Sequence, residues 1–255
     1  MCSKICWYHS SYNGVPDSLK CDKSVDKVGS SGLPLCHEGC KTYSNCKRAF
    51  EMGGFPNKFW NVPDNFIVTP EDLSSAQFLS RVNKSIVSFV ETGQNLFIHS
   101  SIPGNGKTFR SVFLANSYIR HCVNAVRYSD NWVQYILIPK LINEYESVER
   151  LPYDSEVRQR FFNRLRMLSR TNLVVWDDFG FDSESYFETV TLRSIIQSRL
   201  ANNQSNIFVS SCSLQDLRSI LKKTDYSRFE SSVIDVELKS ADFRCYNKQL
   251  FEERC

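Results

Sequence analysis

The sequence predicts an α/β fold, with a parallel β-sheet between two layers of helices and a small cysteine-rich module ahead of it. From about residue 70 onward, short apolar segments of strand length alternate with longer segments of helical periodicity. The first 50 or so residues are instead rich in Cys, Ser, Gly and Lys and have little apolar periodicity. The chain has 255 residues, of which 42% are hydrophobic and 23% charged, which excludes wholesale disorder.

The overall charge does not identify a partner. The chain has 31 Lys and Arg against 28 Asp and Glu, a net charge of +3, so any basic binding face must be local. No apolar run approaches the roughly 20 residues that a membrane-spanning helix needs. The N-terminus also lacks the uninterrupted apolar stretch of a secretory signal. We therefore expect a cytoplasmic protein with no membrane partner.

The helices and strands are expected in a regular order. Residues 70–93 begin after a threonine cap with a proline at the first helical position, and a glycine ends this predicted helix. Asn95–His99 is a short apolar strand, and a helix from Thr108 to about Cys122 follows a glycine-containing loop. The alternation continues with strands at 133–139, 172–178 and 206–212 and helices at 139–149, 156–170 and 190–203. Such alternation predicts a parallel sheet covered on both faces.

The loop before Thr108 has the sequence of a phosphate-binding loop, Ser101-Ile-Pro-Gly-Asn-Gly-Lys-Thr108. Its glycines would let backbone N–H groups converge on phosphate oxygens at a helix N-terminus. Lys107 would bridge the β- and γ-phosphates of ATP, and Thr108 would offer its hydroxyl to Mg²⁺. The first position, usually glycine, is serine here. The nucleotide-binding residues predicted in this loop are Pro103, Gly104, Asn105, Gly106, Lys107 and Thr108.

A second strand is predicted to bring carboxylates to the same site. Leu173–Asp178 consists of four apolar residues followed by two acids. Asp177 would hold Mg²⁺ through water, and Asp178 would polarise the attacking water. Glutamate is more common at the latter position, so we expect slow hydrolysis of ATP.

These motifs, with two segments that follow them, resemble the RecA-like AAA+ ATPases that load bacterial replicative helicases. The two segments are TLRSIIQSRLANNQSNIFVSSCSLQDL and YSRFESSVIDVELKSADFR, and the resemblance spans residues 70–245. The relevant families are the DnaC and DnaI type loaders, which are relatives of IstB-type transposition ATPases and of the initiator DnaA. The resemblance implies an AAA+ domain over 70–255 that loads a hexameric replicative helicase onto single-stranded DNA during replication initiation.

The resemblance also assigns three further site residues. Ser210 or Ser211 matches the sensor that detects the γ-phosphate, with Ser211 nearer the end of its strand. Arg228, in Ser-Arg-Phe, matches the arginine finger that reaches the nucleotide of a neighbouring subunit, which implies self-association through the nucleotide interface. Arg244 matches the second-sensor arginine, which contacts nucleotide in its own subunit.

Clustered cysteines at the N-terminus indicate a metal site in residues 1–52, with 53–69 as a linker rich in Gly and Pro. Cys36, Cys40 and Cys46 are close enough in sequence to bind one Zn²⁺, with Cys21 or Cys6 as the fourth ligand. An iron–sulfur cluster is the alternative, and the reserve ligands are His9, His37 and Cys2. The text LPLCHEGCKTYSNCKRAF resembles the zinc-bearing domain of DnaI-type loaders, which engages the helicase.

The basic helix 157–170 is a candidate for contact with DNA. Helical spacing places two of its arginines on one face, where they could follow a single-stranded backbone, while a solvated helix face is the other interpretation. Lys222 and Lys223 have the same two interpretations. The arginines are Arg158, Arg160, Arg164, Arg166 and Arg170, of which Arg160 and Arg164 share the face.

Two other functions fit the same motifs. An IstB- or TnsC-like ATPase would polymerise on DNA and regulate a transposase. A zinc adaptor would bind ATP without turnover, an alternative kept open by Ser101 and Asp178.

Overall fold

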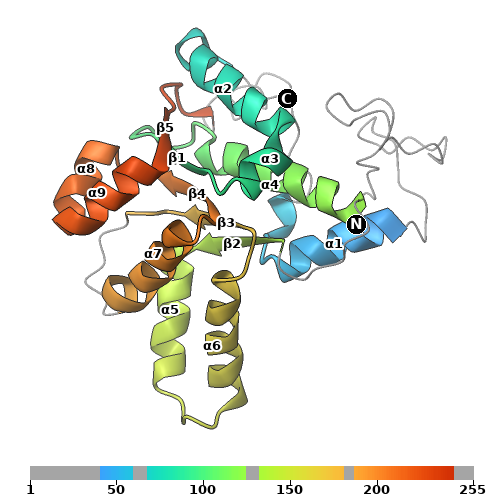
Figure 1. Ribbon diagram of the computed structural model, residues 1–255, viewed down its shortest axis with the longest axis vertical. Coiled ribbons are helices and arrows are strands. Elements are labelled where there is room, and N and C mark those ends of the chain that lie inside the picture. Colours follow the sequence, from blue (N-terminus) through green and yellow to red (C-terminus); the bar gives the residue numbers. More distant parts are fainter. Residues whose placement is uncertain (1–40, 60–67, 125–131, 181–186, 244–255) are drawn as a thin grey trace, which may run out of the picture.

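A computed structural model describes residues 41–59, 68–124, 132–180 and 187–243, and these form one parallel five-stranded sheet between helices (Figure 1). The strand order is β2-β3-β4-β1-β5, with every neighbouring pair parallel. The α/β class predicted from the sequence is thereby confirmed. The strands are β1 (Asn95–His99), β2 (Val133–Leu137), β3 (Leu173–Asp177), β4 (Ser205–Ser210) and β5 (Val233–Glu237).

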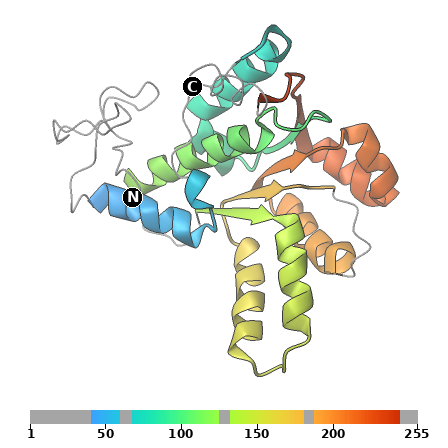
Figure 2. The same cartoon turned by 180° about the vertical axis from the view of Figure 1, so that it is seen from behind.

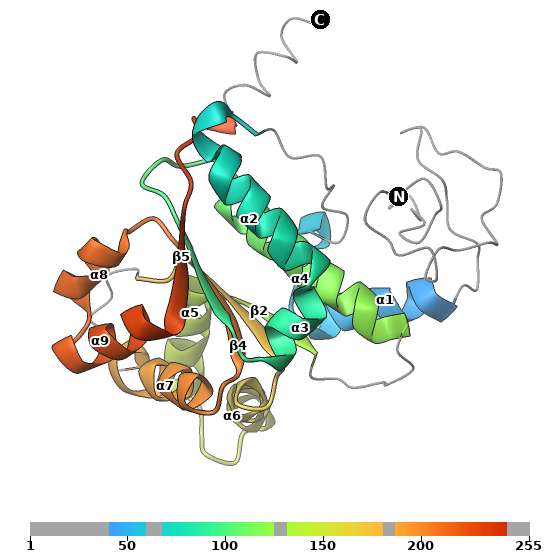
Figure 3. The same ribbon diagram turned by 45° about the horizontal axis from the view of Figure 1, so that its top comes forward.

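Helices cover both faces of the sheet, and Figure 3 shows the two layers on either side of it. The first layer contains α1 (Lys41–Met52), α2 (Leu73–Lys84), α3 (Ile86–Glu91) and α4 (Lys107–Asn124). The second contains α5 (Ile138–Glu149), α6 (Glu156–Leu168), α7 (Arg193–Ala201), α8 (Leu214–Ile220) and α9 (Lys223–Ser232). Short helical turns lie at Asn57–Phe59, Pro70–Asp72 and Phe187–Leu192. The second leads into α2 and the third into α7.

The central strands are apolar because both of their faces are covered. Leu96 and Ile98 of β1 pack with α1–α4, whereas Phe97 between them packs with the helices of the second layer. All five residues of β1 and of β3 are buried. This is the pattern expected of parallel strands in the middle of a sheet.

The predicted strands and helices correspond to observed ones, with two kinds of difference. Residues 70–93 form a helical turn, α2 and α3, with a break at Ser85, instead of one helix. α1, α8, α9 and β5 had no predicted counterpart. β5 is an edge strand whose residues are mostly exposed and include two acids, so it lacks the apolar run that identified the other strands.

The N-terminal part of the described chain differs from the predicted division into a module ending at residue 52 and a linker from 53 to 69. Phe50, Phe55 and Phe59 are buried in the same hydrophobic core as β1 and α4. Gly54, with φ 71°, turns the chain after α1, and the Gly53 carbonyl accepts a hydrogen bond from the Tyr135 N–H at 2.8 Å. Residues 41–59 are therefore part of the α/β domain, because aromatic side chains between the glycines and prolines supply apolar area. Residues 1–40 and 60–67 lie outside the described part.

A buried arginine joins the second helical layer to the sheet. Arg199 of α7 is fully buried, and its Nε donates to Asn206 Oδ1 at 2.7 Å. Its other nitrogens donate to three backbone carbonyls, those of Leu168, Thr171 and Ser205. Burial lowers the pKa of Arg199 to about 9, so the guanidinium remains charged at neutral pH. Its hydrogen bonds compensate for the loss of water around that charge.

A second buried charge connects α2, α4 and the segment after β5. The Asp72 Oδ1 accepts hydrogen bonds from the backbone N–H groups of Lys239 at 2.6 Å and Ser240 at 3.3 Å. The other oxygen of Asp72 lies 3.5 Å from the guanidinium of Arg110, and both side chains are almost fully buried. Burial lowers the pKa of Arg110, and the charge of Asp72 opposes this shift. Asp72 thus holds the residues after β5 beside the start of α4.

Replacing Asp72 with Ala should lower the free energy of unfolding by about 3–5 kcal/mol, because it removes the buried carboxylate that faces the buried charge of Arg110. Urea denaturation of the two proteins measures this difference. Glu71→Ala is the matched control, since Glu71 is exposed in the same helical turn. Equal loss of stability in the two variants would contradict the assigned role of Asp72.

Candidate nucleotide-binding site

The predicted phosphate-binding loop connects the end of β1 to the start of α4, at the carboxyl edge of the sheet. Ligands of open α/β sheets bind at this edge. Gly104 and Gly106 have φ values of 70° and 90°, which residues with side chains rarely adopt. Ser101 has no positive φ, since Asp178 and Asn203 are the non-glycine residues with one in the described part of the chain. Serine at the first motif position is therefore accommodated without backbone strain.

Ser100 and Asn105 fix the loop from inside, and both are buried. The Ser100 Oγ accepts hydrogen bonds from the Ile102 N–H at 3.1 Å and from Asn105 Nδ2 at 2.6 Å. Asn105 Nδ2 also donates to the Leu238 carbonyl at 3.2 Å. Asn105, predicted to contact nucleotide, thus supports the loop through its side chain. The role of Ser100 in supporting the loop was not predicted. The sequence shows only that a residue with a hydroxyl group stands between a buried strand and the loop.

Pro103 lies in the loop after β1, and Lys107 is the first residue of α4. The Lys107 ammonium donates to the carbonyls of Ser100 at 2.9 Å and Ile102 at 3.0 Å, so it lies against the loop itself. Pro103 is exposed at the tip of the loop. A bound phosphate would offer the ammonium a charged partner in place of neutral carbonyl groups, which strengthens the hydrogen bonds.

The side chains of Thr108 and Asp177, the two predicted magnesium ligands, are in contact. The Thr108 hydroxyl donates to the Asp177 carboxylate, with its oxygen 3.1 Å from Oδ1 and 3.2 Å from Oδ2. Hydroxyl and carboxylate oxygens are the ligands that Mg²⁺ prefers, so this pair fits the ion that accompanies a nucleotide triphosphate. These two residues would hold Mg²⁺.

Tyr135 of β2 is a third member of this cluster, and the sequence analysis missed it. Its hydroxyl donates to Asp177 Oδ2 at 2.5 Å. Burial raises the pKa of Asp177, and the hydrogen bonds from Tyr135 and Thr108 oppose that shift. Burial and the neighbouring carboxylates also raise the pKa of Tyr135, so the phenol keeps its proton and acts as a donor. A tyrosine within a buried strand gives no sign in the sequence that its hydroxyl bonds an acid on the neighbouring strand, two residues along in register.

Asp178 follows β3 in an unusual backbone conformation. Its φ is 58°, and its N–H donates to Asp177 Oδ1 at 3.2 Å. The side chain of Asp178 is exposed, unlike that of Asp177. A strained residue beside a buried acid is typical of functional sites. The two acids therefore differ in environment: Asp177 is buried and Asp178 is open to water.

The two candidate sensor serines have different surroundings. Ser210, at the end of β4, donates to the Phe179 carbonyl at 2.6 Å, and its Oγ accepts from the Cys212 N–H at 2.9 Å. It therefore joins β4 to the turn after β3. Ser211 is exposed. The predicted assignment to Ser211 thus falls on the side chain that is open to a ligand.

Of the two predicted arginines, Arg228 belongs to the described part of the chain. Arg228 lies on α9 and is exposed, with no ion pair to any side chain of the described residues. Asp225, one turn earlier, forms an ion pair with Arg193 at the start of α7, which fixes α9 to the domain. Arg244 lies outside the described residues.

The segment before Arg244 contacts the phosphate-binding loop. The Phe243 N–H donates to the Gly104 carbonyl at 3.3 Å. A Cβ placed on Gly104 would lie 1.8 Å from Asp242 Oδ1, so the Asp242 carboxyl occupies the space that a side chain would need. Gly104 is therefore required for both its conformation and this contact.

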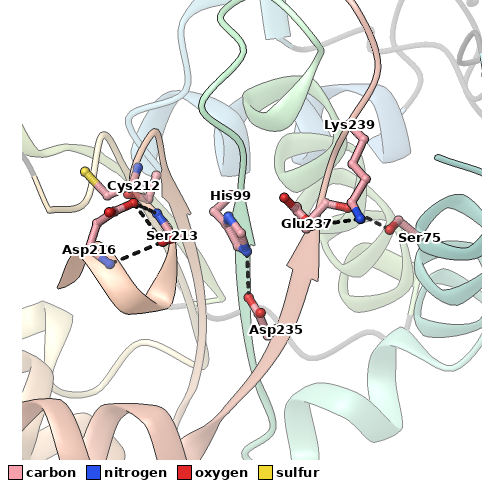
Figure 4. Close-up of polar contacts among 9 residues, drawn as sticks. Ser75, His99, Cys212, Ser213, Asp216, Asp235, Glu237 and Lys239 are labelled. Carbon is pink, nitrogen blue, oxygen red and sulfur yellow. Dashed lines mark hydrogen bonds and ion pairs between the residues drawn. The ribbon is translucent and has the colours of Figure 1, made fainter. Parts of the chain in front are cut away.

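Polar contacts at the neighbouring strand ends are shown in Figure 4. His99, the last residue of β1, is buried and pairs with Asp235 of β5 at 3.0 Å. Ser213 and Asp216 form a capping box that starts α8. The Ser75 hydroxyl of α2 donates to the Glu237 carbonyl at 2.7 Å. These contacts fix the elements that surround the loop.

The predicted basic stripe is largely used within the domain. α5 and α6 form a pair that extends away from the sheet (Figure 2). Arg158 donates to the backbone carbonyls of Glu149 at 2.9 Å and Leu151 at 3.0 Å, where α5 ends. Arg160 pairs with Glu156 and Arg164 with Glu144. This arrangement favours the solvated helix face over a free basic track for DNA.

The zinc prediction rests mainly on residues outside the described part, namely Cys6, Cys21, Cys36 and Cys40. Cys46 is described, and its side chain is fully buried in the core with Phe50. Among the described residues, no group of three or more His, Cys, Asp or Glu side chains could hold a metal ion. The zinc site remains a prediction. No helix in the described ranges has the length and hydrophobicity to cross a membrane.

Solved structures similar to this chain include proteins of DNA replication. The DnaC helicase loader has 19% identity and a TM-score of 0.55, covering 72% of this chain and 100% of that chain. DnaI has 16% identity and a TM-score of 0.54, covering 72% and 95%. AMPPCP-bound DnaA from Aquifex aeolicus has 18% identity and a TM-score of 0.52, covering 77% of this chain and 56% of that chain. No protein-family model and no curated protein matches the sequence.

The fold is the AAA+ fold. The predicted resemblance to loaders of the DnaC and DnaI type is confirmed in this respect. Identities of 16–19% establish the fold alone.

Gly104→Ala should destabilise the AAA+ domain more than Gly106→Ala. Both positions have positive φ, which costs about 1–2 kcal/mol for a residue with a Cβ. A Cβ at Gly106 meets nothing within 4 Å, whereas one at Gly104 collides with Asp242. Thermal unfolding measures both losses, and adding Asp242→Ala should remove the extra loss at Gly104. Equal loss at the two glycines would contradict the contact with Asp242.

Proposed function

We propose that this protein is an ATPase that binds a hexameric replicative helicase and helps to place it on single-stranded DNA in the cytoplasm during replication initiation. The observation that carries the ATPase part is the meeting of Thr108 with Asp177 at 3.1 Å, beside a loop with two left-handed glycines. The helicase part is supported by the fold shared with the DnaC helicase loader, all of which is covered by the match. AMPPCP-bound DnaA, of the same fold, supports ATP as the nucleotide.

Each site residue has a separate task in the proposed reaction. The loop N–H groups and Lys107 bind the phosphates, while Thr108 and Asp177 hold the Mg²⁺ that neutralises them. Asp178, exposed beside the buried acid, orients and polarises the attacking water. Ser211 and Arg244 would sense the γ-phosphate from the same subunit.

Arg228 would act between subunits. Its exposure on α9 and its lack of an ion pair within the described chain leave it available to a neighbouring nucleotide site. An arginine supplied from outside stabilises charge on the transferring phosphoryl group. Hydrolysis would then depend on self-association, which suits a timing switch between ATP-bound assembly and release.

The cysteine-rich N-terminus would bind Zn²⁺ and grip the helicase. This part of the proposal rests on the cysteine spacing and on the resemblance to the zinc-bearing domain of DnaI-type loaders. The segment 41–59, which follows it, is packed into the AAA+ core. A partner bound by the N-terminus would therefore be linked to the nucleotide-binding domain directly through this segment.

Asp178→Asn should keep nucleotide binding and reduce phosphate release by about 10²–10⁴-fold, because the amide cannot accept a proton from water. Asparagine tolerates the φ of 58°, so the fold should be unchanged. Phosphate release and binding of a fluorescent ATP analogue measure the two properties. Asp154→Asn, at an exposed site near α6, is the control. Phosphate release at the wild-type rate in Asp178→Asn would move the catalytic role elsewhere.

The helicase proposal is tested with the purified full chain and the replicative helicase of its own host. We expect the two to co-elute in size-exclusion chromatography in the presence of ATP and Mg²⁺, and the helicase to be transferred to single-stranded DNA. ATP-dependent filaments on duplex DNA without helicase binding would instead support a regulator of transposition. Tight ATP binding without phosphate release would support an adaptor.

A further inference from the structure

Tyr135 lies at the junction between the nucleotide site and the N-terminal segment of the domain. It belongs to β2, beside β3, and its hydroxyl donates to Asp177 Oδ2 at 2.5 Å. The side chain is 8% exposed. A buried tyrosine with a structural role can satisfy its hydroxyl with any polar group. The partner of Tyr135 is instead the carboxylate that would hold Mg²⁺.

Residues 53–59, which we term the docking segment, hold Tyr135 from the opposite side. The ring of Tyr135 packs against Phe55 and Phe59, with ring centroids 5.6 Å and 5.7 Å apart. Its backbone N–H donates to the Gly53 carbonyl at 2.8 Å. Backbone and ring contacts of Tyr135 are therefore both made by the docking segment.

The same segment also contacts the loop side of the site. Phe59 packs edge-on against Phe109, the residue after Thr108, with centroids 5.5 Å apart. The Phe59 carbonyl accepts a hydrogen bond from Asn116 of α4 at 2.9 Å. Both expected magnesium ligands are thus next to an aromatic residue that contacts the docking segment. Thr108 precedes Phe109 in the chain, and Asp177 accepts the hydrogen bond from Tyr135.

We propose that Tyr135 is a positioning residue for the magnesium site, which holds the Asp177 carboxylate toward Thr108 and is itself held in place by the docking segment. This inference rests on the proposed nucleotide-binding function. Hydrogen bonds to metal-binding carboxylates fix the orientation in which they bind the ion, and their loss typically weakens metal binding about 10–100-fold. A partner that displaces residues 53–59 would therefore change the affinity for Mg²⁺ without touching the nucleotide.

The test uses the full chain and a fluorescent ATP analogue, titrated with Mg²⁺. Tyr135→Phe removes only the hydroxyl, and we expect the Mg²⁺ concentration at half-saturation to rise at least about tenfold. Binding of the analogue in excess EDTA should stay as in wild type, because the loop that binds phosphate is unchanged. This split separates a positioning role from general damage to the fold.

The matched control is Tyr118→Phe. Tyr118 of α4 is also buried, and its hydroxyl accepts a hydrogen bond at 3.0 Å from Asn172, which lies at the end of β3 opposite to Asp177. The control should leave the Mg²⁺ titration unchanged. Thermal unfolding of each variant shows whether the proteins compared are folded.

Phe55→Leu tests the docking segment without altering the hydroxyl. We expect a shift in the Mg²⁺ titration in the same direction as for Tyr135→Phe, but smaller. A wild-type titration in folded Tyr135→Phe, or tighter Mg²⁺ binding, would overturn the positioning role. A wild-type titration in folded Phe55→Leu would overturn the part played by the segment. If wild type itself shows no Mg²⁺-dependent nucleotide binding, the proposed function fails and takes this inference with it.

Discussion

The site depends on keeping a charged carboxylate, that of Asp177, inside the domain. Burial raises its pKa and makes the ionised form costly, and the hydrogen bonds from Thr108 and Tyr135 offset that cost. Those two donors come from α4, which covers one face of the sheet, and from β2, the strand next to β3. The acid thus fixes how the loop, the sheet and the N-terminal aromatic residues sit relative to each other. A protein that had no use for the charge would be as well served by an apolar side chain there.

The parallel sheet supplies the geometry around this acid. β4 lies between β1, which leads into the loop, and β3, which ends at Asp177. The hydroxyl of Ser210 ties the end of β4 to the turn after β3, and the Ser210 carbonyl accepts the Ser100 N–H at 3.2 Å. Loop and acids are therefore positioned by adjacent backbone segments, which suits a site that must hold a phosphate and a metal ion at fixed separation.

The sequence was informative where chemistry is local. The loop from Ser101 to Thr108 and the two acids at the end of β3, Asp177 and Asp178, were predicted because each motif joins a strand to a turn within a few residues. Partners distant in sequence were not predictable in this way. Tyr135 resembles any strand tyrosine, and Arg199 resembles a solvated helix residue although it is fully buried. The aromatic residues of 53–59 were hidden among glycines and prolines that suggested a linker, and the edge strand β5 was too polar to be recognised.

The central claim is that a triphosphate with Mg²⁺ binds in the loop before α4. Isothermal titration of ATP into the wild-type protein and Lys107→Ala, with and without Mg²⁺, tests it most directly. The account predicts Mg²⁺-dependent binding to wild type at one site per chain, and at least about 100-fold weaker binding to the variant, because the ammonium is the main side-chain partner of the phosphates. Equal affinity in the two proteins, or no binding by a folded wild type, would contradict it.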